Sequence, residues 1–237
     1  NTAMSSFTGN IIMALKPPMM KQYAEKDYEK VNRYFNFSNK AVFFSLLLIL
    51  LPIYFEMEEV LKLWLDVKDA QTSLFCRLIL IYALVLALNN PISIIVQATG
   101  NIKAYSTFVE IPTLLCFPVT WILFAIGMPA ETAFIIMIIA IIISHIIRLI
   151  CLKKLFPLFS YREYSFNFIV PALTILFLVS IGLYLIKTMM GAGIIRLLMV
   201  AFIGAILLGG LCLLIGFNEF ERDTIFRFLH IKKKMVK

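Results

Sequence analysis

Six long runs of apolar residues constrain the fold of this chain more than any other feature of its sequence. A helix needs roughly 20 apolar residues to cross about 30 Å of hydrocarbon. The shortest of the six runs is extended by further apolar residues on both sides. Because hydrocarbon offers no partner for unpaired backbone groups, each run is expected to be a helix. The runs cover residues 41–55, 74–98, 104–127, 133–151, 168–186 and 194–217.

Composition supports a membrane protein and argues against a soluble one. Of the 237 residues, 61% are hydrophobic and only 15% are charged, whereas a soluble domain carries about 25% charged residues. A membrane β-barrel would need segments of about ten residues with alternating polarity, and residues 135–143 show no alternation. The expected fold class is therefore an all-α, multi-pass helix bundle.

The sequence before the first run predicts two further segments. Residues 1–15 reach only about 22 Å as a helix, so we interpret them as the end of a truncated transmembrane helix; the alternative is a flexible N-terminus. Residues 16–40 begin with Pro17 and Pro18, which suit a helix start. Over these residues apolar and charged side chains fall on opposite helix faces, which predicts a cytoplasmic amphipathic helix lying in the membrane interface.

The remaining chain divides at its linkers. Residues 41–153 are expected to form four transmembrane helices. Residues 168–217 are expected to form two additional, almost entirely apolar helices at the periphery. In the second of these, Gly204, Gly209 and Gly210 are expected to allow close helix contact. Residues 218–237 form a basic tail. The fold expected is thus six complete transmembrane helices plus the end of a seventh.

Basic residues give the orientation. Six helices place residues 15–40, 100–103, 153–167 and 218–237 on one side of the membrane. That side, with Arg148 included, holds 17 of the 22 Lys and Arg residues. By the positive-inside rule it is cytoplasmic, as is the C-terminus. The net charge of +8 is then a topology signal that also attracts anionic membrane lipid, and no nucleic-acid partner is expected.

Catalytic and metal-binding patterns are scarce. The cysteines Cys76, Cys116, Cys151 and Cys212 lack metal-ligand spacing and lie in apolar runs, where they are typical of packing residues. The two histidines, His145 and His230, are far apart in the sequence. No phosphate-binding loop is present. We therefore expect neither an enzyme nor a cofactor nor a metal site.

Polar residues inside the apolar runs carry the functional information, because polarity in hydrocarbon is costly. They form one stripe on each of three consecutive helices, each spanning about 80° to 100° at about 100° per residue. Helix-to-helix hydrogen bonding and snorkelling of Arg148 would explain many of them, but for Glu110 we favour a water-filled cavity, with a fixed ion pair as the competing interpretation. The stripes contain Tyr82, Asn89, Asn90, Ser93 and Gln97; Ser106, Glu110, Thr113 and Thr120; and Ser144, His145 and Arg148. Prolines 91, 112 and 118 are expected to break the first two helices.

Three strings give a resemblance to a known family. They read LKPPMMKQYAEKD at residues 15–27, LPIYFEMEEVLKLWL at 51–65 and NPISIIVQATGNIKAY at 90–105. In order and spacing they resemble polysaccharide flippases, of the O-antigen or capsule type, in the multidrug/oligosaccharidyl-lipid/polysaccharide exporter superfamily. One departure is Lys16-Pro17-Pro18, where Asn-Pro is commoner in the family. It leaves the turn intact but removes one polar side chain near the inner gate.

The resemblance implies that the chain is the C-terminal half of such a MATE-like flippase, whose partner is the missing N-terminal half. The family moves a polyprenyl-pyrophosphate-linked oligosaccharide from the inner to the outer leaflet of the bacterial inner membrane by alternating access between two helix bundles. The lipid tail would stay in the membrane beside the last two helices. The anionic pyrophosphate would give Arg148, and after it Arg77, a binding role. The cavity would be lined by Arg148, Glu110, Asn89, Asn90, Gln97, Arg77 and His145.

Two other classes are weighed against the flippase. A cation-coupled small-molecule exporter of the same superfamily would need an acidic cavity, but here Arg148 and Arg77 offset a single Glu110. A membrane-embedded transferase would need carboxylates or a histidine clustered at the membrane surface, and the sequence shows no such cluster.

Overall fold

The computed structural model is all-helical and describes residues 2–66, 69–100, 102–219 and 221–223. Within these residues six helical segments are long and apolar enough to cross a membrane, as the sequence predicts. They cover Tyr28–Phe55, Ala70–Thr99, Tyr105–Ala125, Glu131–Leu155, Tyr161–Met189 and Ile194–Gly216. The elements are α1 (Thr2–Ala24), α2 (Tyr28–Phe55), α3 (Met57–Leu65), α4 (Ala70–Ala87), α5 (Asn89–Thr99), α6 (Ile102–Ala125), α7 (Glu131–Leu155), α8 (Tyr161–Tyr164), the π-helical turn η1 (Ser165–Ile169), α9 (Val170–Met189), α10 (Ile194–Leu211) and the π-helical turn η2 (Cys212–Gly216).

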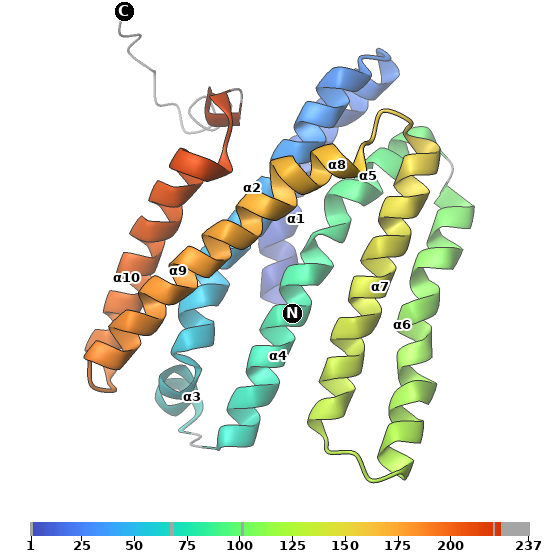
Figure 1. The fold of residues 1–237 in the computed structure, drawn as a ribbon. Helices are drawn as coiled ribbons and strands as arrows, with labels where there is room; N and C mark the ends of the chain where they lie inside the picture. Colours follow the sequence, from blue (N-terminus) through green and yellow to red (C-terminus); the bar gives the residue numbers. More distant parts are fainter. Residues whose placement is uncertain (1, 67–68, 101, 220, 224–237) are drawn as a thin grey trace, which may run out of the picture.

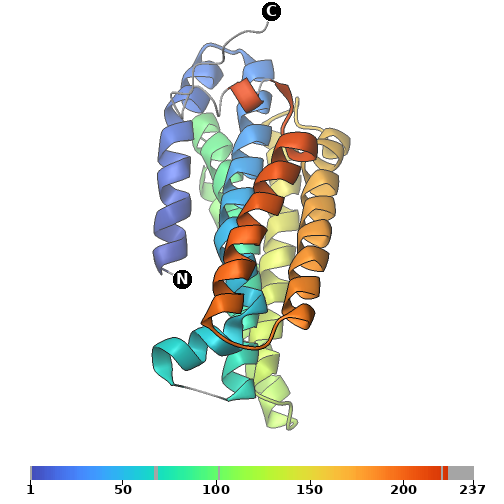
Figure 2. The same cartoon turned by 90° about the vertical axis from the view of Figure 1, so that its left-hand side faces the viewer.

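The long helices run side by side between two ends of the bundle (Figures 1 and 2). One end, which we call the α1–α2 end, holds the turn between α1 and α2 and the links from α5 to α6 and from α7 to α8. The other, the α3 end, holds α3 and the turns from α6 to α7 and from α9 to α10. Helices α2 and α4 lie at the centre, with α9 and α10 on one side and α6 and α7 on the other (Figure 1). The described residues of the predicted cytoplasmic linkers thus share one end.

The prediction of a separate amphipathic helix over residues 16–40 is wrong, and so is a boundary after residue 15. Pro17 and Pro18 lie inside α1, which continues to Ala24; neighbouring helices make prolines tolerable there. The chain turns at residues 25–27, where Lys26 has φ +59° and the Asp27 carboxylate accepts a hydrogen bond from the Lys30 backbone N–H at 3.1 Å. From that N-cap, α2 runs 28 residues without interruption.

The apolar face assigned to that amphipathic helix is used inside the protein. Val31 and Phe35 are fully buried. Phe35 stacks on Tyr164 with ring centroids 5.9 Å apart and meets Phe159 edge-on at the same separation. Contacts of this kind join α2 to the chain around α8. Protein therefore covers this part of the face, whereas Met20 at its start is exposed.

The two predicted helix breaks have different outcomes. The second span is interrupted at Leu88, between α4 and α5, three residues before Pro91. By contrast, α6 passes through Pro112 and Pro118 as one helix, so the expected break there is wrong. A proline removes one hydrogen bond and adds a steric clash, which bends or breaks a helix according to context.

Helices α9 and α10 pack on α2 through small residues. A Cβ on Gly204 of α10 would lie 3.2 Å from Leu183 of α9 and 3.7 Å from Pro52 of α2, so this glycine does permit close contact. Gly209 and Gly210 have nothing within 4 Å of such a Cβ, and their predicted contact role is wrong, because both face away from the bundle. Much of α6, α9 and α10 is exposed, so exposure does not single out the last two helices as peripheral.

A buried ion pair attaches the end of the described chain to α2. Lys40 Nζ lies 2.7 Å from Glu221 Oε2, and both side chains are almost fully buried. Asn218 and Glu221 also cap each other, since each backbone N–H donates to the other's side chain, at 2.8 and 3.0 Å. Most of the predicted basic tail, residues 224–237 with His230, lies outside the described residues.

Candidate functional site

Arg148 stands at the centre of a polar cluster within the span region, two turns from the end of α7. Its side chain is 10% exposed. One terminal nitrogen donates to the Tyr105 hydroxyl at 2.8 Å and the other to Glu110 Oε1 at 2.9 Å. The guanidinium carbon also lies 5.4 Å from the centroid of the Tyr105 ring. Among the described residues the buried Nε has no hydrogen-bond partner.

Glu110 differs from Arg148 in its exposure. Its side chain is 55% exposed on α6, although it makes the ion pair. The two partners therefore have different surroundings: the cation is held inside the bundle and the carboxylate opens to the outer face of α6. Of the two interpretations of Glu110 that the sequence leaves open, the structure contains the ion pair with Arg148.

His145, one turn before Arg148 on α7, connects two further elements, α5 and α8. Its Nδ1 lies 2.9 Å from Asn89 Oδ1, and its Nε2 lies 3.3 Å from the Tyr164 hydroxyl. Because an amide oxygen only accepts, Nδ1 carries the hydrogen in this arrangement and Nε2 accepts from Tyr164. This is the pattern of a neutral imidazole. Asn89 is buried, and its Nδ2 has no partner among the described residues.

Two serines complete the polar cluster. Ser144 donates to the Val109 carbonyl at 2.7 Å and so fixes α7 against α6. Ser93 lies 3.5 Å from the Tyr105 hydroxyl and donates to the Asn89 carbonyl at 3.0 Å. The cluster therefore joins α5, α6, α7 and α8 through hydrogen-bonded side chains. Its members are Asn89, Ser93, Tyr105, Glu110, Ser144, His145, Arg148 and Tyr164.

A pocket of about 330 Å³ lies between α4, α6 and α7. Tyr82 of α4 lines it together with Thr113 and Thr120 of α6. The polar stripes predicted on these two helices therefore meet at one cavity. Glu110 lies one helical turn from Thr113 on the same helix.

Three of the predicted cavity residues lie outside the polar cluster. Gln97 is exposed and accepts a hydrogen bond from Lys16 at 2.8 Å. Asn90 is half-buried beside Asn89, and no contact of the cluster involves it. Arg77 lies near the start of α4, at the α3 end, where it donates to the Tyr54 carbonyl at 3.0 Å and to Glu58 at 2.6 Å.

Arg77 belongs instead to an ion-pair network at the α3 end. Arg196 of α10 binds Glu56 Oε2 through two nitrogens, at 3.0 and 2.7 Å, and Glu56 is fully buried. Lys187 of α9 lies 3.6 Å from Glu58. Burial acts to raise the pKa of Glu58, but hydrogen bonds from its own backbone and from Arg77, with the charges of Arg77 and Lys187, lower that pKa below its ordinary value of 4.5. Glu56 and Glu58, at the start of α3, thus anchor the helices α4, α9 and α10.

Sequence reasoning did not include Tyr105 and Tyr164 in the cavity. A tyrosine at the end of an apolar run is typical of the interfacial belt. From sequence alone, such a tyrosine is therefore not distinguished from one that packs inside the bundle. Tyr105 is the last residue of the string at 90–105, and that position was the only signal pointing to it. Among the described residues, no three His, Cys, Asp or Glu side chains come together as a metal site.

Comparison with protein-family models, with curated proteins and with solved structures finds no match to this chain. The functional argument therefore depends on the residues and their geometry.

Proposed function

We propose that this chain is part of a transporter that flips a polyprenyl-pyrophosphate-linked oligosaccharide from the inner to the outer leaflet of the bacterial inner membrane by alternating access. The resemblance of the strings at 15–27, 51–65 and 90–105 suggests the class. A second helix bundle would face α6 and α7 and complete the cavity. Several large apolar side chains of α6, including Phe117 and Trp121, are well exposed, which suits such a contact or lipid.

The observation that carries the proposal is the guanidinium of Arg148. A buried arginine within a span is costly, so its presence favours a functional role. It is oriented by Tyr105 and Glu110, and its Nε has no partner among the described residues. Arginine presents planar, fixed donors that match phosphate oxygens.

The ion pair suggests how binding would proceed. A pyrophosphate oxygen that approaches from the open face of α6 would replace the Glu110 carboxylate on Arg148, since both are oxyanions with similar geometry. Glu110 is half-exposed and able to turn away. Protonation of Glu110 would weaken its hold on Arg148 and favour this exchange. Tyr105 would keep the guanidinium in place throughout.

One observation favours the alternative of a cation-coupled small-molecule exporter. The more accessible charge of the ion pair is the carboxylate of Glu110, and the neighbouring pocket beside Tyr82 has room for a small organic cation. In that case the exposed carboxylate would bind cargo and Arg148 would only orient it. The two functions predict opposite results for removal of the guanidinium.

The test is transport by Arg148 variants of the full-length protein in proteoliposomes. The probe is a fluorescent polyprenyl-pyrophosphate disaccharide, whose appearance in the opposite leaflet is measured. Arg148→Ala should lose most of the transport, by about tenfold or more, because hydrogen bonds between charged groups contribute roughly 1.5 to 3 kcal/mol. Arg148→Lys should keep part of it, since it retains the charge without the planar donors.

Arg162→Ala is the matched control, because Arg162 is an exposed arginine of α8 at the same end of the bundle. It should transport normally. Full flipping by Arg148→Ala at normal protein level would contradict the proposal. Export of a small organic cation that survives in Arg148→Ala but fails in Glu110→Gln would favour the exporter.

A further inference from the structure

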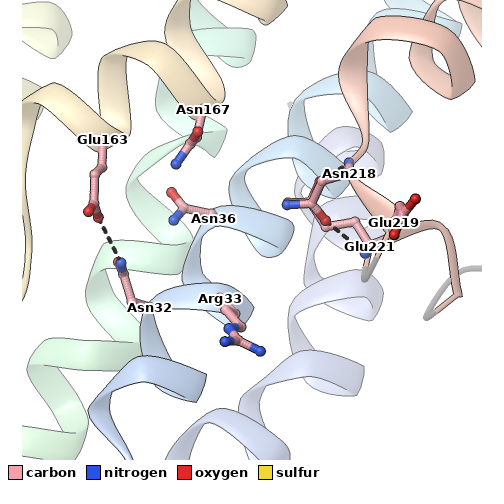
Figure 3. A pocket seen from close by; sticks show the side chains of 8 residues that line it. All are labelled: Asn32, Arg33, Asn36, Glu163, Asn167, Asn218, Glu219 and Glu221. Carbon is pink, nitrogen blue, oxygen red and sulfur yellow. Dashed lines mark hydrogen bonds between the residues drawn. The ribbon is translucent and has the colours of Figure 1, made fainter.

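A second polar site lies at the α1–α2 end, on other residues than those of the polar cluster. It is a pocket of about 590 Å³ between α2, the chain around η1 and the segment after η2 (Figure 3). Four asparagines line it: Asn32, Asn36, Asn167 and Asn218. The other lining residues are charged: Arg33, Glu163, Glu219 and Glu221. Among the described residues, every side chain that lines the pocket is polar and none is aromatic.

The fifth and sixth spans both lead to this pocket, and each contains a π-helical turn next to it. Asn167 lies within η1, at the start of the fifth span, and Asn218 lies two residues after η2, at the end of the sixth. Wide turns of this kind are rare and frequently occur at functional sites. Here they place one carboxamide from each helix in the same pocket.

The pocket contains both positive and negative side chains, and they occupy different parts of its wall. Figure 3 shows Arg33 and Asn36 of α2 between Glu163 on one side and Glu219 on the other. Glu163 accepts a hydrogen bond from Asn32 at 3.1 Å, and Glu221 is paired with Lys40 at 2.7 Å. The described lining has three carboxylates and Arg33, and Lys40 neutralises one of the carboxylates from outside the lining, so the described residues carry one negative charge. A polyanion is therefore disfavoured, whereas a group with one positive and one negative charge suits the site.

The pocket lies at the boundary between polar and apolar surface. Phe166, the neighbour of Asn167 in the sequence, is 64% exposed. Leu214 of η2, one turn before Asn218, is 75% exposed. Exposed apolar side chains continue along α9, as at Val170. A ligand with a polar head in the pocket and hydrocarbon chains along these helices would satisfy both surfaces, which is the chemistry of a membrane lipid.

We propose that this pocket binds the headgroup of a phospholipid with a primary ammonium group, phosphatidylethanolamine. The ammonium has three N–H donors, which match the carboxylate of Glu219 and the amide oxygens of the asparagines. The phosphate accepts from Arg33 and from amide N–H groups. A choline headgroup has no N–H donors and needs aromatic faces, which the described lining residues do not offer. An anionic headgroup would add negative charge to a site that already has an excess.

The proposal goes beyond the flippase, because it concerns a resident membrane lipid and a site separate from Arg148. It is tested by native mass spectrometry of the delipidated full-length protein with equal amounts of dioleoyl phosphatidylethanolamine, phosphatidylcholine and phosphatidylglycerol. The ethanolamine lipid should bind most tightly. Glu219→Gln should weaken its binding about tenfold, toward that of the choline lipid, because a charge-assisted hydrogen bond is lost. Arg33→Gln should weaken the binding of all three lipids.

Glu29→Gln is the matched control: Glu29 is exposed on the same helix, at the same end, and does not line the pocket. It should bind lipid as the unchanged protein does. Glu219 is exposed, so Glu219→Gln is expected to fold, which a thermal unfolding curve verifies. Equal or tighter binding of phosphatidylglycerol, or undiminished ethanolamine binding in Glu219→Gln, would overturn the proposal.

A further arm separates this site from the cargo site. Polyprenyl pyrophosphate added in excess should leave the bound ethanolamine lipid in place. Displacement of that lipid, in a manner that Glu219→Gln abolishes, would make the pocket part of the cargo site and overturn the proposal. If the Arg148 experiment contradicts the proposed flippase function, the result for lipid binding at this pocket is unaffected, because the two sites share no residue.

Discussion

At the scale of single residues, the ion pair between Arg148 and Glu110 combines two different environments. The cation is 10% exposed and the carboxylate 55% exposed. Removing one member of a fully buried pair costs roughly 3 to 5 kcal/mol, because it leaves an uncompensated charge. Solvent on the Glu110 side reduces that cost here. Glu110→Gln also leaves an acceptor oxygen for the buried guanidinium of Arg148, so this substitution is a suitable probe of mechanism.

We predict that Glu110→Gln abolishes the dependence of transport on a proton gradient. Glutamine retains the shape and a carbonyl that accepts from Arg148, so the variant should reach the membrane at normal level and bind substrate. It cannot take up a proton, however, and the exchange of Arg148 between Glu110 and substrate would lose its coupling. Transport in proteoliposomes, measured with and without an imposed pH difference, provides the readout.

Glu131→Gln serves as the control for this measurement, because Glu131 begins α7 at the opposite end of the bundle. It should retain the full response to the gradient. If Glu110→Gln also responds normally at every pH tested, the coupling role of Glu110 is wrong. Loss of the variant from the membrane would instead indicate a structural ion pair.

At the scale of the elements, α2 is the helix on which α1, α4, α9 and α10 pack. Its residue Pro52 lies beside Gly204 of α10 and Leu183 of α9, where three helices meet. In hydrocarbon, such packing of small residues supplies much of the association energy, because apolar burial alone gives little. Close contact at Gly204 therefore helps to hold α9 and α10 against α2.

We predict that Gly204→Leu lowers the thermal unfolding midpoint while Gly209→Leu leaves it nearly unchanged. A Cβ at Gly204 would already be 3.2 Å from the end of the Leu183 side chain, so a leucine at this position must displace that side chain or separate the helices. Overpacking of this kind costs roughly 1 to 3 kcal/mol. Gly209 lies on the same helix with nothing within 4 Å. Equal midpoints for the two variants in a detergent unfolding assay would contradict this account of the helix contact.

The elements also show how far sequence reasoning reaches. The spans were predictable because runs such as 133–151 leave only a helix as an option in hydrocarbon. The end of α1 was not, since Pro17 and Pro18 resemble a helix start while the real turn depends on Lys26 and the Asp27 cap. In the candidate site, Arg148, Glu110, Asn89 and His145 were identifiable by their polarity. Their partners Tyr105 and Tyr164 come from other helices, and only packing reveals them.

At the scale of the whole molecule, charge is divided between the two ends. The α3 end places Arg77, Lys187 and Arg196 in ion pairs with Glu56 and Glu58. Those three cations are three of the five Lys and Arg residues expected on the outer side of the membrane. Pairing reduces their effect on the surrounding potential. The α1–α2 end holds the basic linkers, including Lys153, Lys154 and Arg162. This distribution favours the α1–α2 end as cytoplasmic.

We therefore predict that a cysteine at Lys30 is shielded in intact cells and a cysteine at Met128 is accessible. Both positions are exposed, but Lys30 lies in the first turn of α2 at the α1–α2 end, while Met128 lies in the turn between α6 and α7 at the α3 end. Cys76, Cys116, Cys151 and Cys212 are first replaced to provide a background without thiols. An impermeant thiol reagent should then label Met128→Cys from outside, and Lys30→Cys only after the membrane is permeabilised. Three spans separate the two positions, and an odd number places them on opposite sides of the membrane. An even number would place both on the same side, so equal labelling of the two would contradict the helix count. Exchange of the two labelling patterns would leave the fold intact and reverse its orientation.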